Sequence, residues 1–123
     1  TQGVSSAASD VYKRQLWDRA TGAEPFKVAP KLMAAKDRID PNAVMDMAVS
    51  TDTIGGSSGS PAVNARGEII GANFDSTVLT QRNAYGYDRN TNRSVIVTTQ
   101  AVTVALRDVY GMDHLLTELG VSR

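Results

Sequence analysis

A glycine-rich serine segment at residues 53–61 (TIGGSSGSP) constrains the fold of this chain more than any other feature. Its glycines and its proline are typical of a tight, shaped loop and not of a helix or a regular strand. A flexible linker is the alternative interpretation, but segments with a strand pattern flank the loop on both sides, which a linker would not have. In such a loop a serine hydroxyl can stand clear of the backbone and act as a nucleophile.

Ser58 is the candidate nucleophile, because it alone among the serines of the loop has a glycine two positions before it and another directly after it. The N–H groups of Gly56 and Ser58 are expected to point together at a developing oxyanion. Ser57 is expected to shape the loop. A serine hydroxyl is a weak nucleophile alone, so it needs a base and a third group that orients the base.

The chain holds no convincing base for Ser58. His114 is the only histidine, and it follows the serine near the start of a C-terminal helix, where we expect a surface position. Asp52 either braces the loop or forms the acidic floor of a specificity pocket. Asp75 ends a strand beyond the serine, where it either pairs with a substrate ammonium group or is a turn residue. The sequence therefore predicts a nucleophile without the other two members of a triad.

The spacing of apolar residues predicts short strands followed by helices. Strands are expected at residues 44–50, 61–64, 68–75 and 93–99. Helical turns are expected at residues 31–39, at residues 102–109, and after Asp113, which can cap the last helix. The apolar residues of 102–109 recur at helical spacing and are expected to pack in the core. Gly67 suits the left-handed position of a hairpin turn, and Gly111 suits the end of a helix. The predicted fold class is all-β with C-terminal helices.

Composition excludes several kinds of partner and site. Thirteen basic and thirteen acidic residues cancel, so neither nucleic acid nor an anionic membrane surface is expected as a partner. There is no apolar run near the roughly 18 residues of a membrane span. Without cysteine there is no thiolate metal site. Residues 88–99 do not match a calcium loop, because Arg93 and Thr99 stand where glycine and glutamate are required.

The amino terminus does not resemble part of the fold. Residues 3–15 (GVSSAASDVYKRQ) have no strand or helix period, and SSAASDVYKRQ resembles a translated sequencing-adapter read-through. We expect residues 1–15 to be non-native, or alternatively a disordered native terminus, and exclude them from fold reasoning. Residues 16–123 are expected to be the C-terminal portion of a catalytic domain, in a chain that begins inside a longer gene.

From about residue 30 to residue 120 the chain resembles the C-terminal end of the dipeptidyl-peptidase 7/11 family, the serine exopeptidase family S46. The matching segments are STDTIGG (50–56), SGSP (58–61), NARGE (64–68), FD (74–75), RSV (93–95), ALRDVYG (105–111) and the leucines of 115–119. The serine motif alone is shared with many trypsin-like proteases. Phe74 and Asp75, together with the terminal helices, make the resemblance more specific.

The resemblance implies a chymotrypsin-like double β-barrel, of which this chain is the distal part of the second barrel. It implies an enzyme without metal or cofactor that releases dipeptides from the free amino end of peptides. The intact enzyme is expected to be periplasmic or secreted, and homodimeric. Its signal peptide and the His and Asp of its triad are expected in an upstream portion. The fragment alone is therefore expected to be inactive and to fold poorly, since an interlobe surface would be exposed.

The resemblance also implies roles by position. Ser58 is the nucleophile, and the amides of Gly56 and Ser58 form the oxyanion hole. Phe74 and Asp75 belong to the substrate site, with Asp75 holding the α-ammonium group. Ser76 stands where the family sets specificity: glycine there accompanies hydrophobic side chains and arginine accompanies Asp or Glu. Because Ser76 is neither, we expect no strong acidic preference and moderate acceptance of aliphatic or aromatic side chains.

Two other classes remain open. A trypsin-like endopeptidase would share the serine loop but would need no ammonium-binding Asp75. A non-catalytic β lobe could retain the loop without its chemistry. Ser57 also departs from the family, which usually has asparagine at that position. Comparing free with amino-blocked peptides separates the exopeptidase from the endopeptidase.

Overall fold

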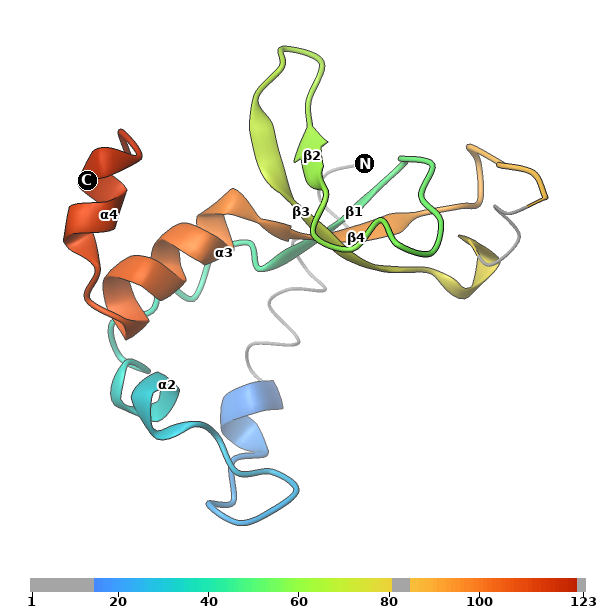
Figure 1. The fold of residues 1–123 in the computed structure, drawn as a ribbon. Coiled ribbons are helices and arrows are strands. Elements are labelled where there is room, and N and C mark those ends of the chain that lie inside the picture. The colour runs from blue at the N-terminus through green and yellow to red at the C-terminus, as the bar shows by residue number, and fades with distance from the viewer. Residues whose placement is uncertain (1–14, 81–84, 122–123) are drawn as a thin grey trace. The chain divides into compact units, whose positions relative to one another are not determined.

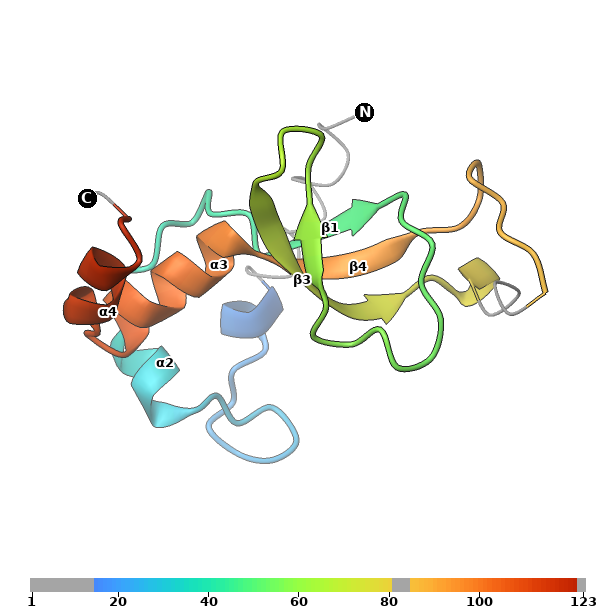
Figure 2. The ribbon, with the colours of Figure 1, turned by 45° about the horizontal axis from the view of Figure 1, so that its top comes forward.

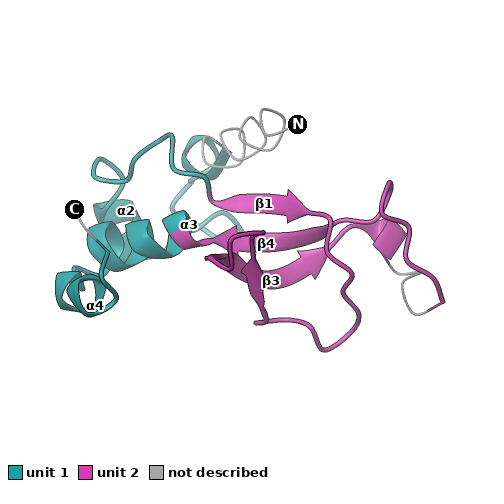
Figure 3. Ribbon diagram, turned by 90° about the horizontal axis from the view of Figure 1, so that it is seen from above, with its two compact units in different colours: residues 1–44, 100–123 teal, residues 45–99 magenta. Residues whose placement is uncertain are grey.

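The computed structural model describes residues 15–80 and 85–121 (Figure 1). The chain divides into two compact units, one of residues 1–44 and 100–123 and the other of residues 45–99 (Figure 3). The predicted non-native or disordered segment, residues 1–15, lies outside the described residues except for Gln15. The serine loop falls wholly within the second unit.

The unit of residues 45–99 is an antiparallel four-stranded sheet with the strand order β1-β4-β3-β2. Its strands are β1 (Asp46–Val49), β2 (Pro61–Val63), β3 (Ile69–Ser76) and β4 (Ser94–Thr98). Each predicted strand is confirmed, with slightly shifted ends. The serine loop connects β1 to β2, so both of its ends are fixed by strands of one sheet.

Strand β3 links the two parts of this sheet. Its first half pairs with β2 and its second half with β4, and the two pairings overlap only at Gly71 and Ala72. The strand bends between its halves, so that the β2–β3 hairpin stands away from β1 and β4 (Figures 1 and 2). A β-carbon on Gly71 would collide with the carbonyl oxygen of Val97. Glycine at this position therefore allows the close approach of β3 to β4.

A β-bulge interrupts β3 where it faces β4. Asn73 pairs with Ile96, but the next pair is Asp75 with Val95, which leaves Phe74 as the extra residue. A bulge of this kind bends the strand and changes which side chains face the core. The alternation of the sequence gives no sign of it.

The bulge decides the faces of the last residues of β3. Side chains of paired residues on adjacent strands lie on the same face of the sheet. Asn73 pairs with Ile96 and Ser76 with Ser94, and these two partners are alternate residues of β4. Asn73 and Ser76 therefore share the buried face, while Asp75 lies on the other face.

The β2–β3 hairpin confirms the predicted turn, with Gly67 at φ +82°. Glu68 Oε2 accepts hydrogen bonds from Arg66 Nη2 at 2.7 Å and from Asn64 Nδ2 at 2.6 Å. These bonds, that of Arg66 foremost, lower the pKa of the Glu68 carboxyl. The turn is thus held by an exposed polar network and by the left-handed glycine.

The other unit is helical in its described part. Its elements are α2 (Pro30–Ala34), α3 (Thr99–Val104, whose first residue belongs to the sheet unit), the π-helical turn η2 (Ala105–Val109) and α4 (Asp113–Glu118). Its buried apolar residues are Ala35, Ala43, Ala101, Val104 and Leu116. None of the described helices has the length and hydropathy needed to cross a bilayer.

The helical predictions need three corrections. α2 ends at Ala34 and does not continue to residue 39. Val102, predicted as core, is 45% exposed, and the wider π turn that follows α3 breaks the simple helical period. Asp113 is the first residue of α4 and not its cap, which is Met112. Gly111 adopts φ +64°, in agreement with its predicted place at a helix end.

Candidate active site

The serine loop consists of two successive hydrogen-bonded turns. The Ser57 N–H donates to the Ile54 carbonyl at 3.1 Å, and the Ser60 N–H donates to the Ser57 carbonyl at 3.1 Å. The third residue of each turn is a glycine with positive φ, Gly56 at +96° and Gly59 at +85°. Positive φ at the third position is what a type II turn requires. The glycines of the motif therefore set the path of the loop around Ser58.

Two anchors fix the loop on the buried face of the sheet. At its entry, Thr53 Oγ1 and Ser94 Oγ lie 2.6 Å apart, and Ser94 Oγ donates to the Thr51 carbonyl at 3.1 Å. Ser94 is fully buried in β4, so this bond joins the loop to the centre of the sheet. The other anchor is β3, whose Asn73 carbonyl accepts from the Gly59 N–H at 2.7 Å.

The loop leaves its reactive groups unbonded. The hydroxyl of Ser58 and the N–H groups of Gly56 and Ser58 make no hydrogen bond to any described residue, whereas the neighbouring amides of Ser57 and Gly59 are bonded. Ser57 Oγ accepts a hydrogen bond from the Ile54 N–H at 3.3 Å. Ser57 thus stabilises the loop, as predicted, and Ser58 is exposed at its tip.

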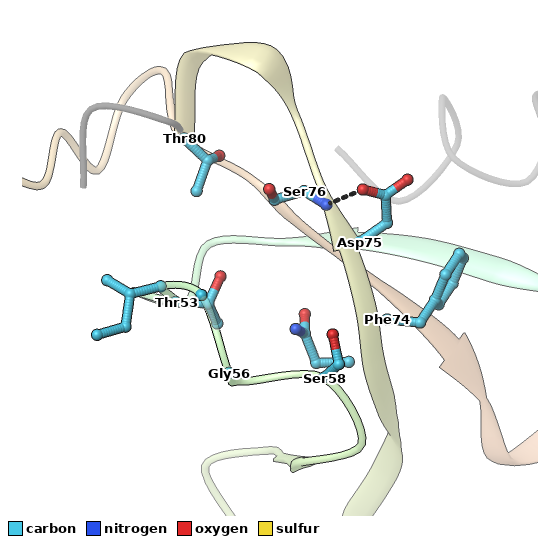
Figure 4. Close-up of a pocket in the computed structure, with 10 residues that line it drawn as sticks. Thr53, Gly56, Ser58, Phe74, Asp75, Ser76 and Thr80 are labelled. Carbon is cyan, nitrogen blue, oxygen red and sulfur yellow. Dashed lines mark hydrogen bonds between the residues drawn. The ribbon is translucent and has the colours of Figure 1, made fainter. Parts of the chain in front are cut away.

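A pocket of about 300 Å³ lies beside Ser58 and is lined by all five residues to which the family resemblance assigns a role, namely Gly56, Ser58, Phe74, Asp75 and Ser76 (Figure 4). Its lining residues are Thr53, Ile54, Gly55, Gly56, Ser58, Asn73, Phe74, Asp75, Ser76 and Thr80. The loop supplies one wall, and β3 with the residues after it supplies the other. Among the described residues of the lining, only Asp75 has an ionisable side chain.

The three β3 residues of the site point in different directions. The side chain of Ser76 lies on the same side of β3 as Ser58, whereas Phe74 and Asp75 extend from the opposite side (Figure 4). This arrangement follows from the bulge. The Asp75 Oδ1 accepts a hydrogen bond from the Ser76 N–H at 2.7 Å, which orients the carboxylate at the rim of the pocket.

The structure separates the other candidates from this pocket. Asp52 lines a second pocket of about 250 Å³ and not the one beside Ser58. His114 is an exposed residue of α4, in the helical unit, in agreement with the predicted surface position. The described residues contain no cluster of His, Asp and Glu that could hold a metal ion.

Sequence reasoning gave no role in the site to the other five lining residues, which are Thr53, Ile54, Gly55, Asn73 and Thr80. Asn73 had a usable signal, because asparagine is depleted in strand interiors and here stands among the apolar residues of a predicted strand. Thr80 lies in the polar segment after β3, where nothing in the sequence distinguishes a buried threonine from an exposed one. It is 5% exposed and donates to the Arg93 carbonyl at 3.0 Å.

Comparison with known proteins gives consistent matches. The sequence model of the family described as Peptidase S46 matches residues 10–121. The chain is 36% identical over 104 residues to the Asp/Glu-specific dipeptidyl-peptidase of Porphyromonas gingivalis, covering 78% of this chain and 14% of that one. It is 34% identical over 72 residues to dipeptidyl-peptidase 7 of Phocaeicola vulgatus, covering 58% of this chain and 10% of that one.

The fold matches as well. The crystal structure of Porphyromonas endodontalis DPP11 in complex with the dipeptide Arg-Asp superposes with a TM-score of 0.72 and 27% identity, covering 86% of this chain. The chain spans only 10% to 16% of the length of these three relatives.

Proposed function

The chain belongs to the peptidase S46 family, and we propose that it is part of a serine dipeptidyl-peptidase that releases dipeptides from the free amino end of peptides. One observation carries the proposal. A single pocket combines the carboxylate of Asp75 with the hydroxyl of Ser58 and the amides of Gly56 and Ser58, which form no hydrogen bond with any described residue. Acyl transfer close to a peptide amino terminus requires such groups: a nucleophile, donors to the oxyanion and an anion that binds the ammonium group.

In the proposed reaction Ser58 Oγ attacks the carbonyl carbon of the scissile bond and loses its proton to a histidine from an upstream portion of the enzyme. That proton then passes to the leaving amine, and water hydrolyses the acyl-enzyme to release the dipeptide. The amides of Gly56 and Ser58 donate to the oxyanion. One such donor typically contributes about 2.7–4 kcal/mol to the transition state.

Asp75 explains the requirement for a free amino terminus in this proposal. Its Oδ1 is held by the Ser76 N–H, and its Oδ2 remains for a substrate α-ammonium group. An extended dipeptide spans about 7 Å. A carboxylate at the rim therefore limits the distance between Ser58 and the amino end of the substrate. Substrates with more than two residues before the scissile bond are excluded.

Ser76 and its neighbours set the side-chain preference. Ser76 faces the pocket, and the described residues that line it include no Lys or Arg that could pair with an acidic side chain. The adjacent Asp75 repels a second carboxylate. We therefore expect uncharged aliphatic or aromatic side chains at the cleaved position, in contrast to the specificity that the name of the P. gingivalis relative states.

The proposal extends to the fold, location and assembly of the intact enzyme. The four-stranded sheet would be the distal part of the second barrel of a chymotrypsin-like double β-barrel, in a periplasmic or secreted, homodimeric enzyme whose upstream portion supplies the triad His and Asp. No described residue forms a hydrogen bond with the Ser58 hydroxyl, in keeping with a base that comes from elsewhere. On this proposal the isolated chain has no peptidase activity.

A hybrid enzyme tests the proposal: residues 16–121 replace the equivalent segment of the P. gingivalis enzyme. We expect cleavage of free peptides with uncharged side chains, loss of that cleavage on amino blocking, and loss of activity in Ser58→Ala. Cleavage of amino-blocked peptides would instead favour an endopeptidase. Activity that survives Ser58→Ala in the hybrid, or turnover by the isolated chain, would refute the proposed role of Ser58 or of the upstream portion.

A further inference from the structure

Asn73 holds the serine loop at three points. Its carbonyl accepts from the Gly59 N–H at 2.7 Å, and its N–H donates to the Ser60 carbonyl at 2.9 Å. Its side-chain Nδ2 donates to the Ser57 carbonyl at 3.4 Å. The bonded groups lie on both sides of Ser58, so Asn73 contacts the backbone of the loop directly before and directly after the nucleophile.

The side chain of Asn73 is poorly suited to a purely structural role. The residue is only 9% exposed, and its buried Oδ1 has no hydrogen-bond partner among the described residues. Rotating the amide would not help, because it would place Oδ1 against the Ser57 carbonyl, which is itself an acceptor. A buried unpaired acceptor opposes folding, and such groups in native proteins call for an explanation.

We propose that Asn73 is a positioning residue for catalysis: its Nδ2 fixes the Ser57 carbonyl and thereby orients the Ser57–Ser58 peptide, whose N–H is the Ser58 oxyanion donor. The N–H of Ser58 belongs to the same peptide plane as the carbonyl that Nδ2 binds, so fixing the one fixes the other. This inference rests on the proposed function. The 3.4 Å bond is long, as bonds in unliganded sites often are.

The test compares Asn73→Leu with Asn92→Leu in the hybrid enzyme. The first substitution removes both polar atoms of the amide at nearly constant volume. Asn92 is also buried, and its Oδ1 accepts a hydrogen bond from Thr91 Oγ1, outside the serine loop. For Asn73→Leu we expect kcat to fall about tenfold or more, KM to stay within about twofold, and the Tm to equal or exceed that of the parent. For Asn92→Leu we expect a lower Tm and an unchanged kcat.

Amide hydrogen exchange in the hybrid enzyme gives a readout that does not depend on activity. In Asn73→Leu the Ser60 N–H, which shares the Ser57 carbonyl, should exchange several times faster, while the Gly59 N–H keeps its backbone partner and its rate. Uniform acceleration across β3 and β4 would mean that Asn73 is only a core residue, and an unchanged Ser60 rate or an unchanged kcat overturns the inference.

The failures of the two proposals are distinguishable. If Ser58→Ala retains activity in the hybrid, the proposed function fails, and Asn73 is then judged by the Ser60 exchange rate alone. If Ser58→Ala is inactive and Asn73→Leu has the parent's kcat, the positioning role fails while the proposed function stands.

Discussion

Replacement of Gly56 by alanine should impair the oxyanion hole, whereas the same replacement at Gly55 should not. A β-carbon at either position meets no atom within 4 Å, so sterics with the surroundings do not distinguish them. Only Gly56 has a positive φ, at +96°. Alanine relaxes to negative φ by turning the peptide between Gly55 and Gly56 over, which converts the turn from type II to type I.

The peptide that turns over carries the N–H of Gly56, which is the proposed oxyanion donor. Holding alanine at positive φ costs about 1–2 kcal/mol, so the turn with the donor in place should become roughly 5–30 times less populated. We expect Gly56→Ala to lower kcat of the hybrid by about that factor or more, up to the roughly 10²–10³-fold loss seen when an oxyanion donor is removed. Gly55→Ala should be neutral or slightly stabilising, by about 0.4–1 kcal/mol.

Steady-state kinetics and thermal unfolding of the two variants provide the assay. Equal values of kcat for Gly55→Ala and Gly56→Ala would refute the reasoning, because the two differ only in φ. A loss of kcat in both would show that the loop does not tolerate any β-carbon, in conflict with the open space around Gly55. A crystal structure of the Gly56→Ala hybrid would show directly whether the peptide has turned over.

Four further outcomes are expected. Asp75→Asn keeps an acceptor for the Ser76 N–H but loses the negative charge. The value of kcat/KM for free peptides should therefore fall about 10–100-fold, as for the loss of a charge-assisted hydrogen bond. An equal loss on an amino-blocked substrate would contradict the role of Asp75 in binding the ammonium group. Ser76→Arg should shift hydrolysis by the hybrid toward Asp and Glu side chains, and an unchanged substrate profile would sink the assignment. Gly71→Ala should destabilise the sheet by about 1–3 kcal/mol, as measured by urea unfolding, with Gly55→Ala as the control. Equal urea midpoints for the two variants would mean that β3 can move away from Val97. Because the pKa of Glu68 is lowered in the folded state, its contribution to stability is present above the pKa of the unfolded state and is lost as the pH falls through the pKa of the folded state. Arg66→Ala should raise the folded-state pKa of Glu68 in a carboxyl NMR titration. An unchanged pKa would show that the hydrogen bond from Arg66 is not what lowers it.

The strands and the shape of the loop around Ser58 could be predicted from sequence because both depend on local chemistry. Alternating apolar residues mark the strands, and the glycines around Ser58 meet a backbone requirement that no other residue meets easily. The exposure of Val102 and the early end of α2 could not be predicted in this way. Val102 lies just before a π-helical turn, and the backbone after α2 continues in turns with i−3 hydrogen bonds. Neither change is visible in the spacing of apolar residues.

Asn73 illustrates a different limit. Its presence in a strand is unusual for its residue type, so the sequence contained a sign that something non-standard occurs there. What it does depends on a pairing between β3 and the serine loop that joins residues 57–60 to residue 73. The sequence can indicate that an asparagine in this strand is unusual, but only the structure shows which residues of the serine loop it bonds.

The bulge at Phe74 connects these observations to substrate recognition. In a regular strand Asn73 and Asp75 would share one face and Ser76 would lie on the other, which would put the acidic group inside the pocket and the specificity residue outside it. The extra residue reverses this order, so that Ser76 faces Ser58 and Asp75 lies at the rim. In the proposed function, a dipeptide bound along β3 would direct its side chain toward Ser76 while its amino end reaches Asp75. The proposed exopeptidase chemistry therefore depends on the register of β3 as much as on the residues that it carries.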